Sequence, residues 1–104
     1  MDSKSVVKCL SALAHESRLM IYRQLIQAGQ SGLNAGKISE LTAMAPNSVS
    51  FHMKELVHAG LVTSRQEGRY VIYTALFNEM NHLIQYLTEN CCSGDHCSVP
   101  QCLC

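Results

Sequence analysis

The stretch NSVSFHMKELVHAGLV, residues 47–62, carries the clearest structural signals in this 104-residue chain. Its apolar residues recur at the spacing of three and four that places them on one face of a helix. Pro46 directly precedes the stretch and suits a first helical position, and Gly60 stands where a helix commonly ends in a left-handed residue. We therefore expect a helix that starts at Pro46 and ends before Gly60. Its apolar face is expected to contain Val49, Met53, Leu56 and Val57.

The segments on either side of this helix predict a winged helix-turn-helix. Upstream, the turn-prone GQSGLN is followed by a short helix that carries Ile38 and Leu41 and ends near Thr42, and AMAPNS then turns the chain into the next helix. Downstream, LVTSRQ and YVIYTAL are β-rich runs separated by Glu67, Gly68 and Arg69. That composition is typical of a hairpin with a glycine turn, which would form the wing.

Amphipathic helices are expected at both ends of the domain. The first carries Val6, Leu10 and Leu13; a second follows a break near His15 and ends at Ala28-Gly29; the last runs from about Asn78 to Glu89. The predicted fold is mainly α with a β-hairpin wing, over residues 1–90, followed by a cysteine-rich tail, residues 91–104. A three-helix core and a small wing leave apolar residues of the first and last helices uncovered, which predicts a homodimer.

Composition sets limits on the environment and the partner. No apolar run approaches the roughly 20 residues of a membrane span, and the first 14 residues lack the pattern of a signal peptide, so we expect a cytoplasmic protein with no membrane partner. Eight basic and eight acidic residues give a formal net charge of zero. This balance is not that of a protein that binds nucleic acid through charge alone, so any DNA binding must depend on local geometry.

The polar side of the 46–59 helix is a candidate DNA-reading surface. Asn can pair bidentately with adenine, Ser and His can bond base edges or phosphates, and an outward Phe can lie against a thymine methyl. Lys37, Lys54, Arg65 and Arg69 would attract the DNA backbone, the two arginines from the hairpin. A solvated helix face is the simpler alternative, but an outward Phe51 argues against it. The candidate residues are Asn47, Ser48, Ser50, Phe51, His52, Lys54, Arg65 and Arg69.

Five of the six cysteines lie in the last 15 residues, NCCSGDHCSVPQCLC. Adjacent Cα atoms are about 3.8 Å apart, too close for an ordinary disulfide, so Cys91 and Cys92 are poor partners for each other. Together with Cys97 they can surround one soft ion, and three thiolates suit trivalent arsenic or antimony. Zinc would need a fourth ligand, which His96, Cys102 or Cys104 could supply. Cys9 stands alone and is expected to be a buried small apolar residue.

Three stretches resemble the ArsR/SmtB family of metal- and metalloid-responsive repressors: LSALAHESRLMIYRQL, NSVSFHMKELVHAGLV and RQEGRYVIY. The resemblance implies a homodimer that holds double-stranded operator DNA and releases it when an inducer binds. YLTENCC followed by a further Cys is similar to arsenite-responsive members whose site lies after the last helix, which implies Cys91, Cys92 and Cys97 as ligands. A site made of Cys91 and Cys92 alone would favour methylarsenite, and antimonite is a further candidate inducer.

Other patterns of the family are missing from this sequence. One arsenic-sensing pattern of the family places cysteines before the DNA-reading helix, but NAGKISELTAM contains none. A zinc-sensing pattern places Asp and His ligands along the last helix, where His82 is the single histidine. Two alternative functions stay open: a repressor switched by thiol oxidation, and a protein-interaction module whose tail holds structural zinc. No cysteine is placed in a recognisable catalytic arrangement, so we do not expect an enzyme. His15, His58 and His82 are expected to be cap, surface or core residues.

Overall fold

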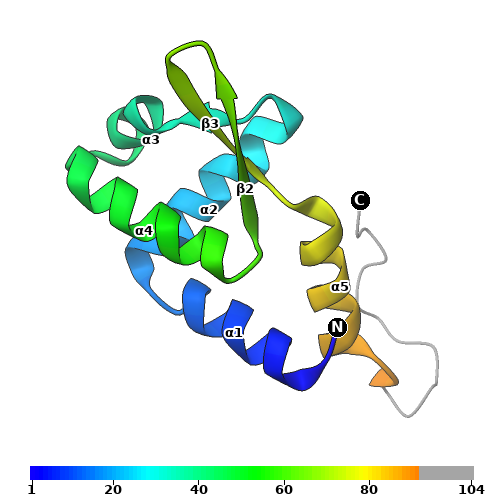
Figure 1. The fold of residues 1–104 in the computed structure, drawn as a ribbon. Helices are drawn as coiled ribbons and strands as arrows, with labels where there is room; N and C mark the ends of the chain where they lie inside the picture. The colour runs from blue at the N-terminus through cyan, green and yellow to red at the C-terminus, as the bar shows by residue number, and fades with distance from the viewer. Residues whose placement is uncertain (92–104) are drawn as a thin grey trace.

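The computed structural model describes residues 1–91, and within them the chain forms five α-helices and three strands (Figure 1). This order matches the winged helix-turn-helix expected from the sequence. The helices are α1 (Ser3–Leu13), α2 (Glu16–Ala28), α3 (Ala35–Thr42), α4 (Pro46–His58) and α5 (Phe77–Thr88). The strands are β1 (Leu33–Asn34), β2 (Val62–Glu67) and β3 (Tyr70–Ala75), with a single 3₁₀ turn, η1 (Gly29–Ser31), before β1.

The two ends of α4 confirm the boundaries predicted from Pro46 and Gly60. Pro46 occupies the first turn, where its missing N–H breaks no helical hydrogen bond. Gly60 has a φ of +84°. Its N–H donates to the Val57 carbonyl at 3.0 Å, and the Leu61 N–H donates to the Leu56 carbonyl at 3.2 Å. This pair of bonds is the Schellman motif, which satisfies the last carbonyls of the helix and turns the chain into β2.

The sheet contains a strand that the sequence did not predict. β1 pairs antiparallel with β3, opposite Tyr73 and Ile72, so the strand order is β1-β3-β2. Gly32, just before β1, has a φ of +72°, and a Cβ there would lie 2.4 Å from the Tyr73 carbonyl oxygen. Only glycine allows the two backbones to approach this closely. The turn-like GQSGLN therefore brings the chain against the sheet.

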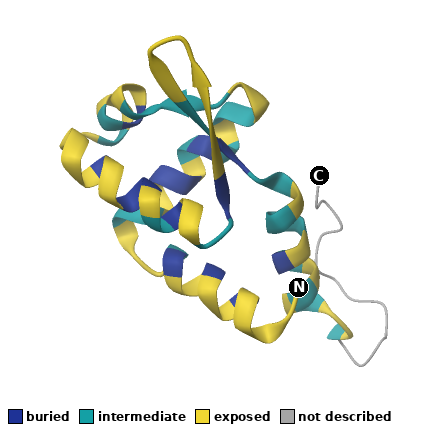
Figure 2. Cartoon of the chain, in the orientation of Figure 1, coloured by how far each residue is buried: buried dark blue, intermediate teal, exposed yellow. Residues whose placement is uncertain are grey.

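The wing is the hairpin of β2 and β3, with Glu67 opposite Tyr70. Gly68, the first of the two residues in its loop, has a φ of +62°, as the first position of a type II′ turn requires. Figure 2 shows that the loop end of this hairpin is exposed, whereas its opposite end is buried. Val62 and Ala75, paired at that buried end, are each 2% exposed.

The core lies where α2, α3, α4 and the base of the hairpin meet (Figure 2). Its most buried members are Ile21, Leu25, Ile38, Val49, Met53, Leu56 and Leu61, each 0% exposed. Val57 differs from the prediction that it shares the apolar face of α4, because its side chain is 40% exposed. In addition, no helix within residues 1–91 is long and apolar enough to cross a membrane.

The two terminal helices form a layer on the side of the core opposite the wing loop (Figure 1). A hydrogen bond of 2.5 Å between Ser3 Oγ and Tyr86 OH joins the start of α1 to the last turn of α5. Leu83 is buried, but Leu10 is 40% exposed and Leu87 is 58% exposed. The single chain therefore leaves apolar residues of α1 and α5 uncovered, as the sequence predicted.

Candidate DNA interface and thiol site

The exposed side chains of α4 are mostly polar, with Phe51 and the partly uncovered Val57 as the large apolar exceptions. Its buried side holds the fully covered Val49, Met53 and Leu56, so residues on the opposite side of the helix are directed away from the core. Phe51 is 55% exposed. An exposed phenylalanine among hydrogen-bonding side chains is a surface that could contact a base edge. The predicted DNA-reading residues found exposed on α4 are Asn47, Ser48, Ser50, Phe51 and Lys54.

His52 was predicted to belong to the DNA-reading surface, but it is buried. Its side chain is only 8% exposed, and its Nδ1 accepts a hydrogen bond from Arg18 Nε at 3.2 Å. Burial lowers the pKa of His52, and the nearby His15 and Arg18 lower it further, against a smaller opposing effect of Glu55. The lowered pKa favours the neutral ring, and the burial and the Arg18 hydrogen bond place the ring between α2 and α4 rather than on the exposed face of α4.

Three other side chains surround His52. The His15 ring lies 4.8 Å from it between centroids, and the Phe51 ring lies 5.5 Å from it, edge to face. The Arg18 guanidinium carbon is 5.8 Å from the centre of the Phe51 ring. We call His15, Arg18, Phe51 and His52 the α2–α4 cluster. Arg18 was missed by sequence reasoning, because nothing in the local pattern of α2 indicates that it meets α4.

The sequence left three roles open for His15, as a cap, surface or core residue, and the structure shows that it caps α2. Its Nδ1 accepts a hydrogen bond from the Ser17 N–H at 3.2 Å, at the start of α2. A side-chain acceptor at this position satisfies one of the first free N–H groups of the helix. The bond also fixes the tautomer of His15, whose Nδ1 must be unprotonated to accept it.

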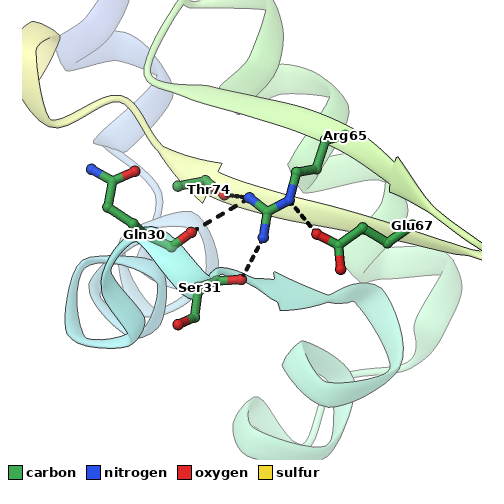
Figure 3. Close-up of polar contacts among 5 residues, drawn as sticks. All are labelled: Gln30, Ser31, Arg65, Glu67 and Thr74. Carbon is green, nitrogen blue, oxygen red and sulfur yellow. Dashed lines mark hydrogen bonds and ion pairs between the residues drawn. The ribbon is translucent and has the colours of Figure 1, made fainter.

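The two wing arginines differ, although both were expected to reach DNA. Figure 3 shows the Arg65 guanidinium directed toward Gln30 and Ser31 of η1 and Thr74 of β3, with Glu67 beside its Nε. Arg65 donates to the Ser31 carbonyl at 2.9 Å and to Thr74 Oγ1 at 3.0 Å. Its Nε also pairs with Glu67 Oε2 at 2.5 Å. A guanidinium held by these partners fastens the hairpin to the body of the domain.

Arg69 lies in the two-residue loop of the wing and is exposed. It is therefore better placed than Arg65 to meet a phosphate. Lys37, near the start of α3, is also exposed and lies 3.8 Å from Glu40, with both side chains at least half exposed. An exposed pair of this kind is weak, so Glu40 leaves Lys37 able to turn toward another anion.

The thiols fall into two environments. Cys9 is 3% exposed, its Sγ–H donates to the Ala59 carbonyl at 3.5 Å, and burial raises the pKa of the thiol, with a further contribution from Glu79. The burial confirms the prediction that Cys9 is a buried small residue, and the raised pKa favours its thiol form. Cys91 is partly buried and follows Asn90, whose φ of +57° turns the chain away from α5.

The other predicted ligands, Cys92 and Cys97, lie outside the described residues, as do Cys102 and Cys104. Within residues 1–91, no three His, Cys, Asp or Glu side chains are grouped as a metal site. A pocket of about 430 Å³ lies beside the end of α5, just before Cys91. It is lined by Met1, His82, Gln85, Tyr86 and Glu89.

The exposed helix-turn-helix, with a wing beside it, defines the class of DNA-binding transcriptional regulators. Comparison with known proteins agrees with this class. The family described as a helix-turn-helix domain matches residues 13–65. The arsenical resistance operon repressor of Bacillus subtilis strain 168 is 30% identical over 92 residues, which cover 83% of this chain and 84% of that protein.

Solved structures are similar over most of the chain. An ArsR-like transcriptional regulator from Rhodococcus sp. RHA1 superimposes with a TM-score of 0.72 at 26% identity, covering 81% of this chain and 76% of that one. Reduced HlyU from Vibrio cholerae N16961 gives a TM-score of 0.68 at 31% identity, covering 86% and 92%. The chain belongs to the ArsR/SmtB family of helix-turn-helix transcriptional regulators, as the resemblance in its sequence indicated.

Proposed function

We propose that this protein is a metalloid-responsive repressor, a homodimer that binds operator DNA and releases it when trivalent arsenic binds its C-terminal thiolates. The observation that carries the proposal is that Cys91 follows the last residue of α5 by only three positions. Figure 1 shows the C-terminal end of α5 on the other side of the domain from α4. The similarity to a Bacillus subtilis arsenical resistance operon repressor supports the choice of ligand.

The DNA contacts are proposed to come from α4 and the wing. Asn47, Ser50 and Phe51 would meet base edges, and Ser48, Lys54 and Arg69 would meet phosphates. The burial of His52 and the hydrogen bonds of Arg65 give these two residues supporting roles instead. Two copies of α4 in a dimer would enter successive major grooves, roughly 34–36 Å apart.

The dimer is proposed to form through α1 and α5. Val7, Leu10 and Leu87 are 60%, 40% and 58% exposed, and all three lie on these two helices. Apolar side chains that the chain itself leaves in water gain stability when a second copy covers them. A symmetric pairing of the same surface is the simplest closed arrangement, and it would set the distance between the two α4 helices.

The inducer site is proposed to contain Cys91, Cys92 and Cys97. Three thiolates suit trivalent arsenic or antimony, and a site with Cys91 and Cys92 alone would suit methylarsenite, which already carries one carbon substituent. Zinc would need a fourth ligand. Cys9 is left out of the site because a buried thiol with a raised pKa is a poor source of thiolate.

Contacts between the described helices support a coupling from this site to α4. The last turn of α5 is joined to the start of α1 by the Ser3–Tyr86 hydrogen bond. Further along α1, Cys9 donates to the carbonyl of Ala59, the residue that caps α4. Gathering thiolates around arsenic would pull on the end of α5 and shift α1 relative to α4. A hundredfold loss of operator affinity requires only about 2.7 kcal/mol of coupling.

The test begins with a duplex selected from a random-sequence DNA pool by the reduced protein. Operator affinity is then measured by fluorescence anisotropy, with and without arsenite, for the wild type and for Cys91→Ser, Cys92→Ser and Cys97→Ser. The wild type should lose about a hundredfold in affinity on adding arsenite, while the serine variants bind the operator normally but fail to release it. Ser93→Ala, which leaves every tail thiol in place, is the matched control and should release the operator as the wild type does.

Three results would contradict the proposal. The protein could select no sequence, arsenite could bind without changing operator affinity, or the Cys91 and Cys92 variants could still release DNA. Repeating the series with antimonite and methylarsenite identifies the preferred inducer, because Cys97→Ser should keep its response to methylarsenite alone if two thiolates are enough.

A redox switch is the second candidate, favoured by the similarity to HlyU, one of whose structures is described as reduced. Two thiolates, from Cys91 or Cys92 and from Cys97 or Cys102, would lose two electrons to peroxide, forming a disulfide while the peroxide is reduced to water. If the protein is an arsenite sensor, arsenite should release the operator under reducing conditions. A phosphine reductant suits this test because, unlike a dithiol, it does not chelate arsenite. Release by peroxide alone, with no arsenite response under reducing conditions, would favour the redox switch.

A further inference from the structure

The α2–α4 cluster joins the start of one core helix to the exposed edge of the proposed DNA-reading helix. Two of its members, His15 and Arg18, belong to the beginning of α2, and the other two are neighbours on α4. His52 is buried, whereas Phe51 beside it is 55% exposed. The cluster therefore connects a fixed part of the domain to a side chain that can meet a partner.

Arg18 makes two contacts in this cluster. Its Nε donates to His52 Nδ1 at 3.2 Å, and its guanidinium carbon lies 5.8 Å from the centre of the Phe51 ring. A planar guanidinium can donate from its edge while its charge lies near an aromatic face, which the ammonium of a lysine cannot do in the same way. Arg18 thus contacts both the buried ring and the exposed ring.

The buried ring provides a fixed base for this arrangement. His52 is covered by His15, whose ring is tilted by 53° against it, and by Arg18. The lowered pKa of His52 keeps its Nδ1 available as an acceptor near neutral pH. Because Phe51 meets His52 edge to face at 5.5 Å, its ring has neighbours on one side before any DNA is present.

We propose that Arg18 is a positioning residue for sequence recognition, which holds the exposed Phe51 ring in the orientation that meets a thymine methyl group. This inference rests on the proposed function, because it assumes that the outward face of α4 reads DNA. Arg18 acts through Phe51 and His52 and does not itself contact a base. A ring that is oriented in advance loses less freedom on binding, so the methyl contact discriminates more strongly.

The test compares the selected operator with duplexes in which each thymine is replaced in turn by uracil, which lacks only the methyl group. For the wild type, replacing one particular thymine of either half-site should weaken binding by about fourfold, the effect of losing one buried methyl group. Phe51→Ala should remove this dependence, and Arg18→Gln should reduce it to less than about twofold. The double variant should show no further loss of methyl dependence than Phe51→Ala alone.

Arg23→Gln is the matched control, since Arg23 is an exposed arginine on the same helix that contacts no member of the cluster in the described structure. It should keep the wild-type methyl dependence. Arg18→Lys provides a second variant that retains the charge; it should lose methyl dependence while the salt dependence of binding stays as in the wild type. Thermal unfolding of each variant identifies any that fail to fold.

The inference is overturned if Arg18→Lys keeps the full methyl dependence, or if Arg18→Gln reduces the salt dependence and leaves the methyl dependence unchanged. The second result would make Arg18 a direct phosphate contact. A wild type that selects a sequence but shows no thymine dependence also overturns it, while the proposed function stands. A wild type that selects no sequence instead contradicts the proposed function itself.

Discussion

Met53 and Lys54 are neighbours on α4, but they lie in opposite environments. Met53 is 0% exposed in the core, and Lys54 is exposed on the outward face. Since every third or fourth position returns to the same side of a helix, α4 separates the residues that hold the fold from those free to bind a partner. Two further pairs, Leu87 with Leu41 and Arg65 with Arg69, compare residues of the same type that are expected to have different roles. Each pair can be tested by substitution.

The largest expected effect on stability is at the buried face. Met53→Ala should lower the free energy of unfolding by about 2–5 kcal/mol, because it leaves a cavity among side chains that are themselves fully covered. Urea unfolding at a fixed protomer concentration measures this loss. Lys54→Ala should stay within about 0.5 kcal/mol of the wild type while weakening operator binding and its salt dependence. Equal stability losses for the two variants would contradict the division of α4 into two faces.

A second pair compares exposed leucines. Leu87→Glu, on α5, should weaken dimerisation by about thirtyfold, because a charge replaces an apolar side chain at the proposed interface. Leu41, on α3, is 45% exposed against 58% for Leu87, and Leu41→Glu should leave the dimer intact. Analytical ultracentrifugation without DNA distinguishes the two. If only the Leu41 variant dissociated, the dimer interface would not lie on α1 and α5 as proposed.

A third pair compares the wing arginines. Arg65→Ala should destabilise the domain by about 1 kcal/mol, a modest value because the guanidinium that binds Ser31, Thr74 and Glu67 is still partly exposed. Arg69→Ala should leave stability unchanged but make operator binding less dependent on salt. Thermal melts and salt titrations measure both effects. If the two variants change only the salt dependence, Arg65 is a DNA contact after all.

The smallest effect concerns pH. The pKa of His52 lies below the ordinary histidine value of 6.5 because the ring is buried beside His15 and Arg18, so the neutral ring is favoured in the folded state. The stability this provides is complete above pH about 6.5 and falls as pH decreases toward the folded pKa. His52→Gln should reduce that fall. His58→Gln, an exposed histidine on the same helix, serves as control, and an equal reduction in both variants would contradict the assignment to His52.

Sequence reasoning predicted elements that depend on local chemistry and missed those that depend on distant contacts. Pro46 and Gly60 define the ends of α4 through their own backbone properties, so both boundaries were predicted. β1 has only two residues, too few for any alternation, and its pairing with β3 is possible because Gly32 allows a close approach. The fold class could be predicted without β1, because the order of the helices and the hairpin already defines it.

The candidate DNA face was predicted in part for the same reason. Helical spacing was enough to place Phe51 outward, but it treated His52 as polar and therefore exposed. Only the partner on α2, Arg18, explains why that ring is buried. Likewise, Arg65 could not be separated from Arg69 by composition, because the carbonyl of Ser31 reaches it through the unpredicted approach of η1 to the sheet.

Reciprocal coupling is the most direct test of the central claim, that thiols after α5 control DNA binding by α4. Thermodynamic linkage requires operator DNA to weaken arsenite binding by the same factor as arsenite weakens operator binding. Arsenite affinity is therefore measured by calorimetry for the reduced dimer, alone and saturated with operator. We predict a loss of about a hundredfold, equal to the loss of operator affinity measured separately. An arsenite affinity unaffected by operator would contradict the account.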